Sequence, residues 1–184
     1  MILEELIVAG FGGQGVLSMG MTLAYAGMVE GREVSWMPSY GPEMRGGTAN
    51  CITILSEKRI SSPIIARFST AIVLNQPSME KFAPRVKTGG LLLYESSMVL
   101  QPTDRNDIDL VPIAAIDAAR ELNNPKIMNM IVLGAFLQLK PVVPIPSILE
   151  ALKEVLPEKY HPMIPLNEMA LRKGASMVAH APVF

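Results

Sequence analysis

Residues 6–16, Leu-Ile-Val-Ala-Gly-Phe-Gly-Gly-Gln-Gly-Val, constrain the fold of this chain more than any other segment. A short apolar run stops at a cluster of glycines, and a long apolar segment begins directly after them. This pattern is typical of a buried parallel strand that turns tightly into a helix. We therefore predict an α/β fold, a three-layer Rossmann-like sandwich with a mostly parallel sheet.

The glycines of this segment also carry a functional signal, because Gly10, Gly12 and Gly15 match the spacing G-x-G-x-x-G. In nucleotide sites such glycines form the tight turn, let the backbone approach a phosphate, and let the helix lie close to the strand. The first N–H groups of the helix would then face an anion. Two interpretations stay open, an anion site and a turn that serves only to pack the helix on the strand.

A dinucleotide site needs a further feature, an acidic side chain about twenty residues later at the end of the second strand. The predicted second strand, 33–37, runs instead into Met37, Pro38 and Ser39. An independent dinucleotide-binding oxidoreductase is therefore only the alternative hypothesis for the function of this chain. Titration of the pure chain with NAD(H) or NADP(H) tests it.

A second glycine-rich loop, 39–48, follows that strand and is the most polar loop near the presumed carboxyl edge of the sheet. Glu43 and Arg45 either pair with each other or place one charge against a ligand. Arg45 precedes two glycines whose N–H groups can form an anion-binding nest. Because ligands of open α/β sheets bind at this edge, the candidate anion- or cofactor-binding residues come from both loops: Gly10, Gly12, Gly13, Gln14, Gly15, Tyr40, Gly41, Glu43, Arg45, Gly46 and Gly47.

Length and charge narrow the class of protein. A chain of 184 residues predicts a single domain, 1–184, with one large core. With 16 basic and 17 acidic residues, the chain lacks the excess of positive charge that is typical of proteins that bind nucleic acid or a membrane surface. The start of the chain has no basic n-region, and no apolar stretch approaches the ~20 residues that span a bilayer. A cytoplasmic location is expected.

The reactive side chains give no catalytic constellation. The single cysteine, Cys51, excludes an internal disulfide and cannot alone hold zinc or an iron–sulfur cluster. It falls within the predicted strand 50–56, so we interpret it as a small buried hydrophobe. His161 and His180 lie far from any paired carboxylate and are predicted at the surface. No catalytic residue and no metal site is therefore assigned.

An excess of apolar residues points to a partner. Hydrophobic residues make up 49% of the chain, including thirteen methionines, which is more than a lone domain of this size needs. The predicted helix 16–30 has a nearly bare face formed by Gly20, Ala24 and Gly27, and it is apolar on its other side too. We expect a subunit interface, or a homodimer when the chain is isolated.

The remaining predicted elements are further strands and helices, as expected for an α/β fold. We predict strands at 70–75 and 91–94, the latter introduced by two glycines, and a polar loop at 101–109. Residues 110–113 are expected to form an edge strand because Pro112 cannot donate to a central ladder. Helices are predicted at 78–83, 114–122, 126–139, 145–156 and 166–179.

Taken together, several blocks resemble the gamma subunit of the 2-oxoacid:ferredoxin oxidoreductases. They are Gly10–Gly15, Tyr40–Gly47, Cys51–Ser56, Ile60–Pro63, Asn129–Gly134, and Leu166 and Asn167 with Ala170 and Gly174. The free-standing chain looks most like that of a 2-oxoglutarate:acceptor oxidoreductase, although the indolepyruvate, pyruvate and 2-oxoisovalerate enzymes share the blocks. One departure is Thr70, where the strand often opens with aspartate in this family.

The resemblance implies an enzyme complex of EC 1.2.7 type. In such complexes thiamine diphosphate with magnesium attacks the 2-oxo acid, carbon dioxide leaves, iron–sulfur clusters pass electrons to ferredoxin, and coenzyme A captures the acyl group. The implied partners are alpha, beta and ferredoxin-like delta subunits. This chain lacks the cluster cysteines and the G-D-G segment of a thiamine diphosphate site. Its implied part is structural and ligand-shaping, with Arg45 near the coenzyme A phosphates or at the contact with the cofactor-bearing chain.

Overall fold

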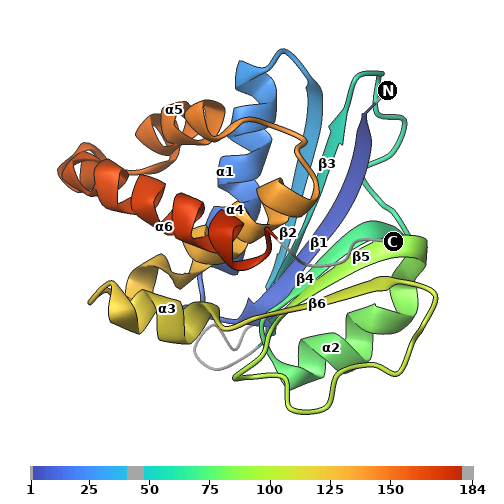
Figure 1. The fold of residues 1–184 in the computed structure, drawn as a ribbon. Coiled ribbons are helices and arrows are strands. Elements are labelled where there is room, and N and C mark those ends of the chain that lie inside the picture. The colour runs from blue at the N-terminus through green and yellow to red at the C-terminus, as the bar shows by residue number, and fades with distance from the viewer. Residues whose placement is uncertain (1, 41–47, 180–184) are drawn as a thin grey trace.

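A computed structural model describes residues 2–40 and 48–179, and shows one six-stranded sheet in the order β2-β3-β1-β4-β5-β6 (Figure 1). The strands are β1 (Leu3–Phe11), β2 (Glu33–Tyr40), β3 (Thr48–Ser56), β4 (Phe68–Val73), β5 (Val86–Glu95) and β6 (Asp109–Ile113). The α-helices are α1 (Val16–Val29), α2 (Gln76–Phe82), α3 (Ala115–Glu121), α4 (Met128–Leu139), α5 (Ile145–Val155) and α6 (Ile164–Met177). Short 3₁₀ turns are Ala83–Arg85, Pro125–Ile127 and Glu158–Met163.

The sheet is mostly parallel, as predicted. β1 pairs in parallel with β4, β4 with β5 and β5 with β6, whereas β3 runs antiparallel to both of its neighbours, β1 and β2. Only seven residues, 41–47, separate β2 from β3, which is too short for the crossover that a parallel pair needs. Because β3 is reversed, β2 runs in the same direction as β1, and both end at the same edge of the sheet.

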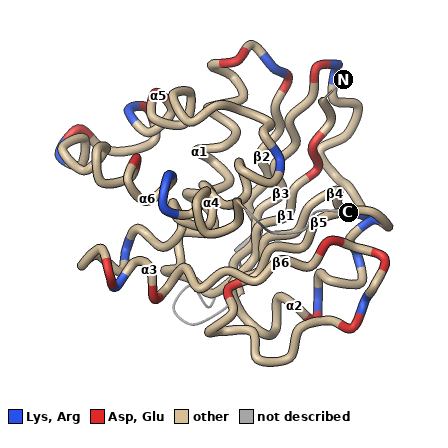
Figure 2. The backbone as a smooth tube through the Cα atoms, in the orientation of Figure 1, with Lys and Arg blue, Asp and Glu red and all other residues tan. Residues whose placement is uncertain are grey.

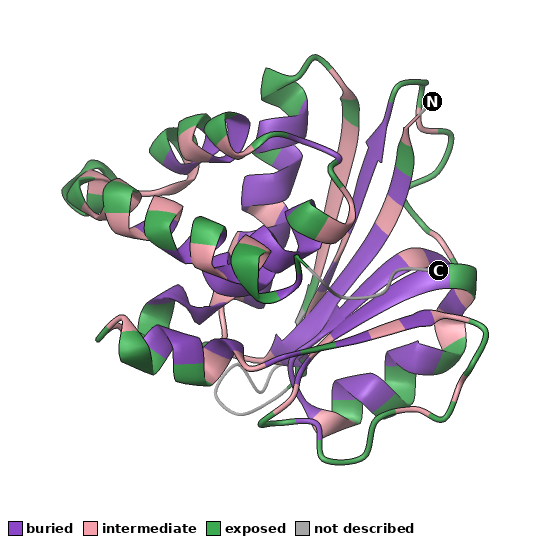
Figure 3. Ribbon diagram, in the orientation of Figure 1, coloured by how far each residue is buried: buried purple, intermediate pink, exposed green. Residues whose placement is uncertain are grey.

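Two apolar clusters cover the two faces of the sheet and make a three-layer sandwich. Leu6 and Val8 of β1 face a large cluster that includes α1, α3, α4, α5 and α6. Ile7 and Ala9 point to the opposite face, where a smaller cluster includes α2. Figure 3 shows the resulting buried sheet between partly exposed helices.

The bare face of α1 packs as predicted. A Cβ atom at Gly20 would overlap Cys51 Sγ and lie 2.9 Å from Thr53 Oγ1, and one at Gly27 would lie 2.5 Å from Leu55 Cδ2. α1 therefore approaches β3 closely with its glycine face, and it packs against α5 on another side. Both apolar sides of the helix have neighbours.

Most element boundaries differ from the prediction by a few residues, and the start of β5 differs most. β5 begins at Val86 rather than at Leu91, because the strand continues through Gly89 and Gly90 with a shift of register near Phe68. Gly89 has a φ of +72°, which only glycine adopts without strain. The helix predicted at 78–83 begins at Gln76.

The polar loop before β6, predicted to be exposed, is held against the rest of the structure by hydrogen bonds of Arg105. The Arg105 guanidinium donates to the carbonyl oxygens of Ala83 and Val86 at 2.8 and 2.7 Å. It also binds the Asp107 carboxylate at 2.6 Å and so lowers the pKa of that carboxyl group below its usual range. β6 lies at the edge of the sheet, as predicted from Pro112. In the described part of the chain, no helix combines the length and apolarity that crossing a membrane requires.

Candidate functional site

The carboxyl ends of β1 and β4 lie side by side, and the helices that follow them pack on opposite faces of the sheet. α1 follows β1 on the side of the large cluster, and α2 follows β4 on the other side. Such a switch point is where ligands bind in open α/β sheets. The candidate site is therefore this edge of the sheet, bordered by the glycine loop 12–15 and by residues 74–76.

Gln14 fastens the glycine loop to the sheet. Its Oε1 atom accepts a hydrogen bond from the Phe11 N–H at 2.6 Å, and its Nε2 atom donates to the Leu74 carbonyl at 3.2 Å. The Gln14 N–H also donates to the Phe11 carbonyl at 3.2 Å. The predicted site residue Gln14 thus lies between the ends of β1 and β4, and its carboxamide links them.

The glycines of this segment differ in whether neighbouring side chains leave room for a Cβ atom. A Cβ atom at Gly10 would lie 2.5 Å from Gln14 Oε1, and one at Gly15 would lie 2.5 Å from the Asn129 amide nitrogen on α4. Gly15 also has a φ of +75°. These two glycines are required for packing. Gly13 differs, because its φ of +93° also favours glycine but a Cβ there would enter open space. Gly12 is half-buried in the same turn.

The N-terminus of α1 follows the glycine loop directly and has no side-chain cap. Its N-cap residue is Gly15, and no acidic side chain occurs in the first turn. The first N–H groups of a helix have no acceptor within the helix, and the helix dipole adds partial positive charge there. The described start of α1 thus has backbone donors available to an anion, with no carboxylate in the glycine loop to repel it.

The second predicted loop leaves the sheet beside the first. Phe11 pairs with Thr48, and Tyr40 pairs with Ala49, so β2 ends and β3 begins at the edge where the glycine loop lies. This confirms that the flanking strand ends share one edge. The candidate residues Gly41, Glu43, Arg45, Gly46 and Gly47 lie outside the described residues, as does the side chain of Tyr40.

Two polar residues at the end of β4 were missed as site residues. Asn75 is buried, and its Oδ1 atom caps α2 by accepting from the Ser78 N–H at 2.8 Å. Gln76 exchanges two hydrogen bonds of 3.0 Å with the backbone of Gln101. The signal was the pattern of Asn followed two residues later by Pro after a buried strand, which is typical of a helix start.

The remaining reactive groups support no catalytic centre. Cys51 is buried as predicted, and burial raises the pKa of its thiol to about 12, so the nucleophilic thiolate does not form near neutral pH. His161 is half-buried in the turn before α6, with Nε2 3.0 Å from the Leu156 carbonyl oxygen. His180 lies outside the described residues. Within residues 2–40 and 48–179, no cluster of His, Cys, Asp and Glu could hold a metal ion.

Comparison with known sequences identifies relatives along nearly the whole chain. Residues 5–177 match the family model for pyruvate ferredoxin/flavodoxin oxidoreductase. The ketoisovalerate oxidoreductase subunit VorA of Methanothermobacter thermautotrophicus is 42% identical over 132 residues, which are 72% of this chain and 27% of that one. The chain thus spans about a quarter of that relative's length. The 2-oxoglutarate synthase subunit KorC of Methanocaldococcus jannaschii is 29% identical over 161 residues, 84% of each chain.

Solved structures share the fold. The gamma subunit of a keto/oxoacid ferredoxin oxidoreductase from Geobacter sulfurreducens matches with a TM-score of 0.84 and 26% identity, over 98% of this chain and 99% of that one. A 2-oxoglutarate:ferredoxin oxidoreductase from Magnetococcus marinus, with 2-oxoglutarate, coenzyme A and succinyl-CoA bound, matches with a TM-score of 0.87 and 24% identity. That match covers 99% of this chain and 32% of the other.

Proposed function

Because this chain belongs to the pyruvate ferredoxin/flavodoxin oxidoreductase family, we propose that it is the gamma subunit of a complex that oxidatively decarboxylates a 2-oxo acid to an acyl-CoA. In that complex, thiamine diphosphate with magnesium would supply the decarboxylation chemistry and iron–sulfur clusters would carry the electrons to ferredoxin. The proposed partners are alpha, beta and ferredoxin-like delta subunits. The observation that carries the proposal is the family match over residues 5–177.

The proposed role of this chain is to shape a ligand site without taking part in the chemistry. A phosphate group at this edge could accept hydrogen bonds from the uncapped first N–H groups of α1, and the space at Gly13 is open. Coenzyme A carries such phosphates. We propose that the glycine loop contacts them and that Arg45 adds a charge-assisted hydrogen bond, or else ties the subunit to the cofactor-bearing chain.

The proposed substrate is 2-oxoglutarate, and 2-oxoisovalerate is the second candidate. Support for 2-oxoglutarate comes from the KorC relative, whose matched region is 84% of both chains. The VorA relative favours 2-oxoisovalerate through its higher identity, over 27% of its length. The side chain of the 2-oxo acid is expected to bind on other subunits, so turnover of each acid by the whole complex decides between them.

An exposed apolar stripe on α1 supports a subunit role. α1 contains no charged residue, and Figure 2 shows the helix without a coloured segment. Its side chains Tyr25, Met28 and Val29 are 38%, 57% and 50% exposed. Isolated exposed apolar residues are common, but a charge-free helix with three of them together is typical of a protein contact. In the absence of partners we expect this surface to drive self-association, which light scattering at micromolar concentration detects.

The isolated chain is expected to be colourless, free of iron and inactive toward 2-oxo acids. The physical reason is that its one cysteine is buried and protonated, which leaves no thiolate set to hold a cluster. Metal analysis, and calorimetric titration with NAD(H) and NADP(H), test this expectation. Stoichiometric iron, or saturable dinucleotide binding at micromolar concentration, would favour the alternative of an independent oxidoreductase.

In the reconstituted complex, Arg45→Ala is expected to raise the Michaelis constant for coenzyme A, or to weaken assembly, by about ten- to a hundredfold. The reason is the loss of one charge-assisted contact, worth roughly 1.5–3 kcal/mol. Arg67→Ala is a matched control, because Arg67 is exposed at the amino end of β4, the opposite edge of the sheet. If Arg45→Ala assembles normally and its coenzyme A dependence matches that of the control, the glycine-rich edge serves packing only.

A further inference from the structure

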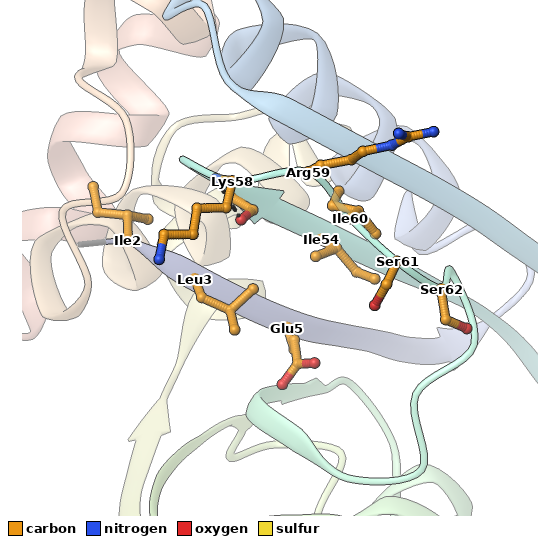
Figure 4. Close-up of a pocket in the computed structure, with 10 residues that line it drawn as sticks. Ile2, Leu3, Glu5, Ile54, Lys58, Arg59, Ile60, Ser61 and Ser62 are labelled. Atoms are coloured by element: carbon orange, nitrogen blue, oxygen red, sulfur yellow. Dashed lines mark hydrogen bonds between the residues drawn. The ribbon is translucent and has the colours of Figure 1, made fainter.

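A second hollow lies at the edge of the sheet opposite the glycine loop. It has a volume of ≈ 200 Å³ and lies where β1 begins and β3 ends. Leu3, Ile54 and Ile60 supply apolar walls (Figure 4). Hydroxyl groups come from Ser61 and Ser62, which Figure 4 also shows, and from Ser56. The glycine loop has no part in this hollow, so the proposed coenzyme A contact does not explain it.

The charge at the hollow is positive and uncompensated. Lys58 and Arg59 line it and are exposed, and neither forms an ion pair with a carboxylate in the described ranges. Glu5 is the one carboxylate of the lining, and the ammonium group of Lys87 already contacts it. Figure 4 shows Glu5 on the other side of the hollow from Lys58 and Arg59. An occupant that carries carboxylates could form ion pairs with Lys58 and Arg59.

Exposed apolar side chains occur in the lining of the hollow and in the loop that carries its two cations. Leu3 is 55% exposed, and Ile64, in the same loop as the two cations, is 73% exposed. Apolar side chains at the centre with charges around them are typical of a protein contact. A hollow of ≈ 200 Å³ has room for one large apolar side chain, but it is smaller than the usual pockets for small-molecule ligands.

We propose that this hollow is the docking site for an acidic segment of a companion subunit. One apolar side chain of that segment would enter the hollow beside Leu3 and Ile54, and flanking Asp or Glu side chains would pair with Lys58 and Arg59. The inference rests on the proposed function, since it takes the partner from the same complex. Charge complementarity carries the choice of an acidic partner, because the hollow offers two cations and no free carboxylate.

The test is the affinity of this chain for companion subunits purified without it. Lys58→Glu combined with Arg59→Glu is expected to weaken assembly at least about tenfold at low ionic strength, and the loss should shrink as salt rises from about 0.01 M to 0.15 M. The neutral pair Lys58→Gln and Arg59→Gln should lie in between. Lys159→Glu, an exposed cation in the Glu158–Met163 turn, is the matched control and should stay within about twofold of the wild type.

A photo-crosslinking side chain at position 61, an exposed residue that lines the hollow, identifies the occupant directly. In the assembled complex it should crosslink to a companion segment that has Asp or Glu within a few residues of the attachment point. Unchanged affinity of the charge-reversed chain, or crosslinking only to a segment without acidic residues, overturns the inference and leaves the proposed function standing. If the wild-type chain itself does not assemble with the companion subunits, the proposed function fails and this inference fails with it.

Discussion

Replacing Gly134 or Gly174 with alanine is expected to lower the free energy of unfolding by about 3 kcal/mol. α4 and α6 cross at these glycines with their backbones in contact. A Cβ atom at Gly134 would overlap the Leu171 carbonyl oxygen and lie 2.6 Å from its carbon. One at Gly174 would overlap the Ile131 carbonyl oxygen and lie 3.0 Å from the Ala135 nitrogen. Backbone atoms cannot rotate away from an added methyl group, so the helices must separate.

The control for this prediction is Gly27→Ala. Gly27 also lies inside a helix, but an added methyl group there would meet the flexible end of Leu55, at 2.5 Å, and Val34 Cγ1 at 2.8 Å. All three substitutions gain the same intrinsic helix preference, about 1 kcal/mol. Urea unfolding should therefore place both α4–α6 variants well below Gly27→Ala. Equal midpoints for the three variants would show that the helices do not cross as closely as described.

Glu95→Ala is expected to cost about 3 kcal/mol of stability, because Glu95 caps a helix from a neighbouring strand. Its Oε2 atom accepts from the N–H groups of Ala115 and Ile116 at 2.8 and 3.2 Å, and Oε1 accepts from the Ser97 N–H at 3.0 Å. The residue is fully buried. Truncation leaves two N–H groups at the start of α3, those of Ala115 and Ile116, without their acceptor, and it also removes the acceptor of the Ser97 N–H after β5.

Glu121→Ala is the matched control, since its carboxylate pairs with Lys173 at 3.1 Å but is 66% exposed. Such surface pairs contribute at most about 1 kcal/mol. Thermal unfolding of both variants, with hydrogen exchange at Ala115 and Ile116, distinguishes a cap from a merely buried side chain. A Glu95→Ala chain as stable as the control, with unchanged protection of those amides, would contradict the assignment.

Local patterns in the sequence predicted much of this fold. The apolar run before Gly10 and the glycines after it specify a strand, a tight turn and a helix within eleven residues, which the structure confirms. The bare face of α1 and the burial of Cys51 also follow from nearby residues. Pro112 marked the edge strand for the same reason, because a missing N–H group is a local property.

Features that depend on distant residues were not predicted. Whether Gly15 is needed for packing depends on Asn129, which is 114 positions away in the sequence and touches it only in the folded chain. The early start of β5 depends on pairing between Val86 and Phe68. The charge around Lys58 and Arg59 could be recognised only once the ion pair between Glu5 and Lys87 was known. The proposed role of Arg45 stays a prediction, since that residue lies outside the described ranges.

We propose that this chain completes a 2-oxo acid oxidoreductase without supplying its redox centres. The most direct test is the rate of ferredoxin reduction, dependent on a 2-oxo acid and coenzyme A, by companion subunits purified without this chain and then titrated with it. We expect little activity before the addition and saturable restoration after it, with the isolated chain inactive throughout. Companion subunits that reduce ferredoxin at the same rate, and with the same dependence on coenzyme A, whether or not this chain is present would contradict the claim.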